Sequence, residues 1–183
     1  DLSGIDLSRS SLEKAILSGA LLAKAKLVSA NLQGADLTKV DLTGASLDDA
    51  VLADARLCGV SAKDASFSGA NLERADLSGA AASHVDFSRA RLCAALVLDG
   101  ADLSGARFSL AKLAGVDLRT TTLRGASFLQ CSLAGANAEG VDLAGCDLTN
   151  STLKKAKLRG AGGASVRAEK ACFDDADLQA CKL

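Results

Sequence analysis

The chain has 183 residues, 49% of them hydrophobic, and a formal net charge of −1 from 21 basic and 22 acidic side chains. This balance argues against a general nucleic-acid binder, an acidic mimic or a polybasic membrane anchor, and polar residues or glycines interrupt every apolar stretch well before the length of a membrane span. Aromatic residues make up only 3%, and Trp, Tyr, Met and Pro are absent, so Leu and Ala must supply almost all of the burial.

Residues 2–92 carry a five-residue repeat. Every fifth residue from Leu2 to Leu92 is Leu, Phe or Ala, and a second position two residues before each of these centres is most often Ala. A helix turns about 100° per residue and would scatter the centres over all its sides, while a straight strand alternates its faces every second residue. The repeat therefore predicts short extended segments with two inward-facing residues each, joined by bends.

Glycine marks the bends. Fifteen of the 17 glycines fall two residues after a centre, among them Gly19, Gly44 and Gly79, where a turn can use a positive φ. Four bends close a square coil of about 20 residues, and about nine such coils would stack into a rod roughly 43 Å long at the usual strand spacing. We therefore expect an all-β solenoid that forms a single domain over residues 1–183, with Leu and Ala filling its interior.

The phenylalanines test this register. Phe67 and Phe87 are 20 residues apart, Phe108 follows after 21, because one residue is inserted at 93–97, and Phe128 follows after another 20. If each coil holds 20 residues, these four rings stack in one inner column.

Two places depart from the repeat. At 93–97 one extra residue separates Leu92 from Leu98, and we expect a corner bulge there, although a protrusion that marks a partner face would leave the same sequence signature. At Ala161–Ala164 the centre is Gly163, which brings no side chain to the core, so we expect local looseness rather than close approach by a ligand.

The repeat unit itself resembles a known family. Ala30–Gly34 (ANLQG), Ala35–Lys39 (ADLTK) and Ala101–Gly105 (ADLSG) are similar to the consensus of the pentapeptide-repeat family, which is Ala, Asp or Asn, Leu, and two variable residues. The resemblance covers essentially the whole chain and implies a right-handed quadrilateral β-helix. It implies little about function, because members range from bacterial topoisomerase inhibitors that imitate DNA to chloroplast, cyanobacterial and eukaryotic proteins of largely undefined role.

The residues that could carry chemistry form no recognisable site. The inward Ala-like position holds three of the six cysteines, Cys131, Cys146 and Cys181, and the other three, Cys58, Cys93 and Cys172, should face outward. None forms a CxxC pair, so we expect all six to be unpaired, which favours a reducing compartment. His84, the single histidine, falls at a bend that faces water. We therefore expect no catalytic residue, no metal site and no cofactor.

Two surface features are candidates for protein contact. The side that carries the Phe column would display a weakly charged strip with two exposed leucines, made of Ser66, Ser68, Ser88, Ser109, Leu110, Ser127, Leu129 and Gln130. A basic corner near the C-terminus, made of Lys154, Lys155, Lys157 and Arg159, would suit an acidic partner or a lipid headgroup. The plain alternatives are scattered surface leucines and a solvated charge cluster. Elsewhere Asp36, Arg56 and Asp76 follow at coil spacing, which predicts alternating charges along the rod.

The repeat begins at the first residue and is still running at the last, whereas stacked repeats normally carry caps over their end coils. We therefore expect partners or further chain to cover the ends. The hypothesis is a non-enzymatic structural or protein-binding module that serves as an accessory subunit of a larger protein complex, with no nucleic-acid partner. The resemblance suggests a photosynthetic or organellar setting, in a plastid or the cytoplasm. The alternative is a DNA-mimicking inhibitor of a type II topoisomerase, against which the near-neutral charge and the missing C-terminal helix argue.

Overall fold

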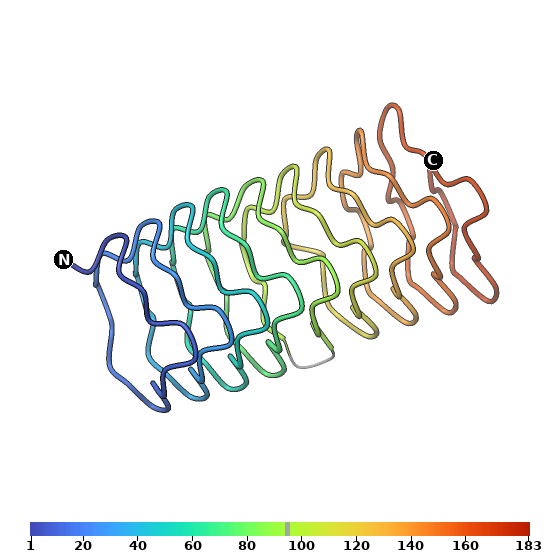
Figure 1. Cartoon of the computed structure of the whole chain (residues 1–183). Helices are drawn as coiled ribbons and strands as arrows, with labels where there is room; N and C mark the ends of the chain where they lie inside the picture. The colour runs from blue at the N-terminus through green and yellow to red at the C-terminus, as the bar shows by residue number, and fades with distance from the viewer. Residues whose placement is uncertain (94–95) are drawn as a thin grey trace.

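The computed structural model describes residues 1–93 and 96–183. The chain winds as a four-sided coil, and successive coils stack along one axis into a rod with the N-terminus at one end and the C-terminus near the other (Figure 1). The described residues contain no helix, and hence none that could cross a membrane, and the coils pair through single bridge positions separated by turns rather than through long strands.

Each side of the coil is a ladder of parallel bridges. The first bridges are Asp6–Lys26 on side 1, Ser11–Asn31 on side 2, Ile16–Asp36 on side 3 and Leu21–Asp41 on side 4. Partners are 20 residues apart until the ladders cross the inserted residue, where Asp76 pairs with Val97 after 21. The register therefore changes where the sequence shifts phase. The predicted corner bulge at 93–97 falls on Ala94 and Ala95, which lie outside the described residues.

The repeat's centres and the Ala-like residues before them fill the inside of the coil. From Leu22 to Ala161 every described residue at these two positions is buried, while those of the end coils, such as Leu7 and Phe173, are half-buried. Full burial of one Leu contributes about 1.5–3 kcal/mol, so these inner columns are the main source of stability. The inward orientation predicted for Leu and Ala is confirmed.

The predicted aromatic column is also confirmed. The ring centroids of Phe67 and Phe87 lie 5.2 Å apart, those of Phe87 and Phe108 5.6 Å, and those of Phe108 and Phe128 4.8 Å. All four rings are at most 1% exposed. A 20-residue coil with one inserted residue accounts for this column.

Tight turns form the corners of the coil. After Leu2, for example, the Ile5 amide donates to the Leu2 carbonyl at 3.2 Å, and Gly4 has a φ of 69°. This is the geometry of a type II turn, whose third residue needs a positive φ. Every described corner has a positive φ at this residue, whether or not it is glycine, with the single exception of Thr120.

The Asp or Asn before a centre forms a second hydrogen bond at the corner. The Asp36 carboxylate accepts the Thr38 amide proton at 3.0 Å, and the Asn71 side chain accepts that of Glu73 at 3.1 Å. These amides take no part in the ladder between coils. Because Asp and Asn side chains commonly bond the backbone two residues on, this contact explains why the repeat favours them at this position.

Gly163 shows a close approach of two coils rather than the looseness that we predicted from its missing side chain. A Cβ at Gly163 would lie 2.4 Å from the backbone nitrogen of Ala144 and 2.6 Å from its Cα. The Gly163 amide also donates to the Lys182 carbonyl at 3.1 Å. Only glycine lets the two backbones pass this closely.

Candidate interaction surfaces

The predicted contact strip lies on side 1, over the stacked phenylalanines. Ser66 and Ser127 are outward bridge residues of this side, and Leu110 and Gln130 lie at its corners. The half-buried members are Ser66, Ser68, Ser88, Ser109, Ser127 and Leu129, and the exposed members are Leu110 and Gln130. The structure therefore brings all the predicted strip residues to one side of the rod.

Charged residues that the prediction left out cross this strip. Asp86 and Arg107 stand between Ser66 and Ser127 on the side 1 ladder and form an ion pair at 2.7 Å. Burial raises the pKa of the Asp86 carboxyl, but hydrogen bonds from Ser88 and the charge of Arg107 outweigh it and hold that pKa below its ordinary value. Because the two charges neutralise each other, the strip keeps little net charge.

A second carboxylate organises the serines at the N-terminal end of the strip. Asp48 accepts a hydrogen bond from the Ser66 hydroxyl and another from the Ser68 amide, the latter at 3.2 Å. The Ser46 hydroxyl donates to the same carboxylate at 2.9 Å. These serines are fixed by the fold, which leaves the region around Leu110 as the better candidate for contact with a partner.

Leu110 is the unusual residue of the strip. It sits at a corner with a φ of 62°, and 54% of it is exposed. The other non-glycine residues with positive φ in the described chain are polar or charged, apart from Ala180. Its amide donates to the Leu129 carbonyl at 3.0 Å, so the two leucines belong to neighbouring coils. A large aliphatic side chain is costly in this conformation, and here the cost is not offset by burial.

The predicted basic corner, where side 2 meets side 3, is partly neutralised by the coil that follows it. Lys154 pairs with Asp174 at 3.1 Å, and Arg159 pairs with Asp177 at 3.2 Å. The hydrogen bond with Asp174 raises the pKa of Lys154. All four members of the cluster are exposed, and the described structure gives no ion pair to Lys155 or Lys157. The cluster is real, but its net positive charge is smaller than the sequence indicates.

Opposite charges also neighbour each other along the rest of the rod. Arg56 lies 3.7 Å from Asp36 in the coil before it, as the spacing predicted. Such exposed pairs contribute little to stability individually. The pair between Arg167 and Asp147 differs, because the atoms are 2.6 Å apart and Asp147 is only 8% exposed.

The thiols are distributed as predicted. Cys131 and Cys146 are buried, and Cys181 is half-buried against the core. Burial raises the pKa of Cys131 to about 12 and that of Cys146 to about 11, which makes both poor nucleophiles. All six cysteines are free.

The single histidine and the acidic side chains give no sign of a metal centre. His84 is exposed at a corner, and its ring lies over Gly105, where an added Cβ would be 2.5 Å from Nδ1. Over residues 1–93 and 96–183, no three His, Cys, Asp or Glu side chains are grouped to hold a metal ion.

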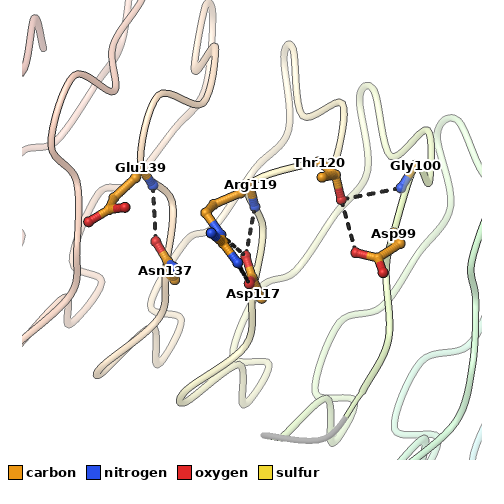
Figure 2. Close-up of polar contacts among 7 residues, drawn as sticks. All are labelled: Asp99, Gly100, Asp117, Arg119, Thr120, Asn137 and Glu139. Carbon is orange, nitrogen blue, oxygen red and sulfur yellow. Dashed lines mark hydrogen bonds and ion pairs between the residues drawn. The ribbon is translucent and has the colours of Figure 1, made fainter.

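A polar cluster at the corner between sides 3 and 4 was not predicted (Figure 2). The Thr120 hydroxyl donates to Asp99 at 3.2 Å and accepts the Gly100 amide proton at 3.3 Å. In the same corner, Arg119 donates to the Asp117 carboxylate at 2.7 Å, and this bond is the main cause that lowers the pKa of Asp117. The sequence signal was the run of three threonines at 120–122, which puts a β-branched residue where the other corners have none.

Comparison with known proteins places this coil in a family. The model for pentapeptide repeats matches in eight copies, at residues 1–38, 25–61, 35–74, 63–96, 86–125 and 126–161. The chain belongs to the pentapeptide-repeat family. Among solved pentapeptide-repeat structures, HetL from the cyanobacterium Nostoc sp. strain PCC 7120, which is involved in regulating heterocyst differentiation, is 32% identical, with 96% of this chain and 76% of HetL covered and a TM-score of 0.53.

A second similar structure is QnrB1, a plasmid-mediated fluoroquinolone resistance protein. It is 16% identical, with 94% of this chain and 91% of QnrB1 covered and a TM-score of 0.63. At this identity the likeness concerns the fold alone. A search of curated proteins found no match.

Proposed function

We propose that this pentapeptide-repeat chain is a non-enzymatic protein-binding rod that serves as an accessory component of a larger complex. Its contact surface is the strip on side 1, centred on Leu110 and Leu129. The observation that carries the proposal is Leu110 itself, held at a φ of 62° with 54% of its surface in water. Strained residues that the fold does not need commonly mark functional sites.

The surroundings of Leu110 suit a protein partner. Leu129 lies on the neighbouring coil, and the exposed amide of Gln130 is beside it. A small apolar centre with a polar rim is typical of protein contact surfaces. The charge of the strip is balanced by the ion pair of Asp86 with Arg107, so binding would rest on apolar contact and hydrogen bonds rather than on charge.

The setting follows from the likeness to HetL. Because that protein comes from a cyanobacterium and shares 32% of its residues with this chain, we extend the proposal to a complex of a photosynthetic organism or organelle. This step rests on likeness and is tested by the identity of the captured partner.

Imitation of DNA is the less favoured function. A mimic must present a row of like negative charges, whereas here basic residues lie beside acidic ones along the rod, as in the pairs Arg56–Asp36 and Arg107–Asp86. The likeness to QnrB1 concerns the fold only. A supercoiling assay with a bacterial type II topoisomerase distinguishes the two functions, and we expect no inhibition at micromolar protein.

The experiment is affinity capture from the native source with tagged wild type and Leu110→Asn. Asn adopts positive φ readily, so this variant removes the apolar side chain without straining the corner. We expect wild type to retain a defined set of proteins and Leu110→Asn to retain at least about tenfold less of them, which is roughly 1.4 kcal/mol of binding.

The matched control is Asn150→Gly, at the same corner of side 1 two coils further on, where Asn150 has a φ of 58°. It should capture partners as wild type does. The proposal is wrong if wild type purifies alone as a monomer, or if Leu110→Asn captures the same proteins in the same amounts.

A further inference from the structure

The corner Asp117–Leu123, which joins side 3 to side 4, differs from every other described corner. The Thr121 amide still donates to the Leu118 carbonyl at 3.0 Å, so the turn is closed, but Thr120 lacks the positive φ of its counterparts. A closed turn without a positive φ at this residue belongs to the type I class. The β-branched side chain explains the choice, because it fits the left-handed region poorly.

Types I and II differ by a flip of the central peptide, here Arg119–Thr120. At a regular corner the amide of the third residue reaches the next coil, as Gly79 does to the Asp99 carbonyl at 2.8 Å. The Gly100 amide should reach Arg119 in this way, but it donates to the Thr120 hydroxyl at 3.3 Å instead (Figure 2). A side-chain bond has therefore replaced a rung of the backbone ladder.

Two bridges are missing on either side of the same corner. Within the described chain no bridge joins Val97 to Asp117 on side 3 or Thr122 to Asp142 on side 4, although the ladders continue with Asp117–Asn137 and Asp102–Thr122. The segment is therefore held to the coil before it through side 4 and to the coil after it through side 3. Sides 1 and 2 of the same coils remain paired, as Arg107–Ser127 and Lys112–Ser132 show.

The core beneath this corner is also incompletely packed. Ala138 replaces the usual Leu at a centre of side 3, and an apolar void of about 20 Å³ is lined by Ala138 together with Leu118 and Leu123 of the corner. A void of this size holds no more than about one water molecule, and an apolar lining offers it no hydrogen bond. The backbone ladder and the side-chain packing are thus weakened at the same place.

We propose that Asp117–Leu123 is a local opening unit, a flap that detaches from the stack while the other sides of its coils stay paired. Opening carries Leu118 and Leu123 away from the core and uncovers the void beneath them. It needs no change in the strip on side 1, so it is independent of the proposed binding function. Segments with few ladder bonds and weak packing are those that open at low free energy in native proteins.

Hydrogen exchange of the complete chain tests this. The amides of Thr120–Leu123 are compared with those of Ser78–Ala82, the corresponding part of the regular corner two coils earlier, whose bridges Ser61–Ala81 and Ala81–Asp102 are both present. We expect exchange at the Thr120 corner to be at least about tenfold faster, after correction for intrinsic rates. Equal protection of the two corners would overturn the proposal.

Thr120→Gly is the second arm of the test. Glycine accepts a positive φ, so the turn can revert to type II and return the Gly100 amide to the Arg119 carbonyl. We expect exchange at this corner to slow by about tenfold or more, although glycine ordinarily loosens a chain. Thr122→Gly places glycine in the same segment without correcting the turn, and it should leave exchange unchanged or faster. If Thr120→Gly behaves like Thr122→Gly, the peptide flip is not the cause of opening and the proposal is wrong.

Discussion

The rings of Phe108 and Phe128 stack inside side 1 with 3° between their planes and 4.8 Å between their centroids. Phe87 lies against the other face of Phe108, 5.6 Å away, so Phe108 takes part in two aromatic contacts. Phe108→Leu removes both and leaves unfilled volume, and we expect a loss of about 2–3 kcal/mol in the free energy of unfolding, measured by denaturant titration. Phe173→Leu, at a half-buried ring on side 2, is the control and should cost less. Equal losses would mean that the stack contributes nothing beyond burial.

The contact of Arg167 with Asp147 should matter more than the exposed ion pairs. Arg167→Ala leaves the nearly buried carboxylate with the Thr149 amide at 3.0 Å but without its cation, and we expect a loss of about 1–2 kcal/mol. Arg74→Ala breaks a pair of similar length whose side chains are 57% and 43% exposed, and its effect should be clearly smaller.

The same pair predicts an acid dependence. Burial raises the pKa of Asp147, but hydrogen bonds from Thr149 and the charge of Arg167 lower it further, and the net pKa lies below its ordinary value. The unfolded state therefore binds a proton at a higher pH than the folded state does. The stability that Asp147 supplies is present above the ordinary pKa of Asp and is lost as the pH falls through the lowered value. Arg167→Ala should reduce this acid-dependent loss, and unchanged acid sensitivity would contradict the role given to the pair.

Gly163 and Gly79 should respond differently to the same substitution. Gly79 has a φ of 64° and no atom near the position of a Cβ, so Gly79→Ala should cost about 1 kcal/mol of conformational strain. Gly163→Ala would push a Cβ into the backbone of Ala144 and force two coils apart, and we expect at least about 2 kcal/mol. Thermal unfolding of both variants checks the order. If Gly163→Ala is the milder change, the coils are not held at this distance.

Cys131 predicts a loss of stability in alkali. Its pKa is raised from 9.0 to about 12 by burial, so between these values the unfolded chain loses the thiol proton while the folded chain keeps it. Stability must then fall as the pH rises through this window. Cys131→Ala, which restores the usual inward residue, should behave like wild type near pH 7 and be more stable above the ordinary thiol pKa. A wild-type curve parallel to that of the variant would contradict this.

The five-residue period was sufficient to predict the interior of the rod. Burial repeats with the backbone, so counting along the chain placed Phe67 and Phe128 in one column before any contact was known. The Asp side chains were read only as polar positions, because nothing in the period shows that Asp36 bonds the amide two residues on. Gly163 was misread for a similar reason, since the close approach of Ala144 depends on the path of another coil.

The outer surface was predicted less well, because its contacts join residues of different coils. The strip on side 1 was assembled from its serines and leucines, and the sequence gave no reason to add Asp48 or Asp86 until the ladders were known. Leu110 was found by its apolar character, but its strain required the backbone angle. Thr120 could have been noticed, because it brings a β-branched side chain to the third residue of a turn.

Parallel pairing at a constant interval of 20 residues has a consequence for the history of this chain. A duplication or deletion of one complete coil leaves all four ladders in phase, so each coil meets a neighbour of the same kind as before. An insertion of any other length must be absorbed at a corner, as happened once between Arg91 and Val97. Genetic change can therefore lengthen or shorten the rod in increments of about 4.8 Å without redesigning its interior.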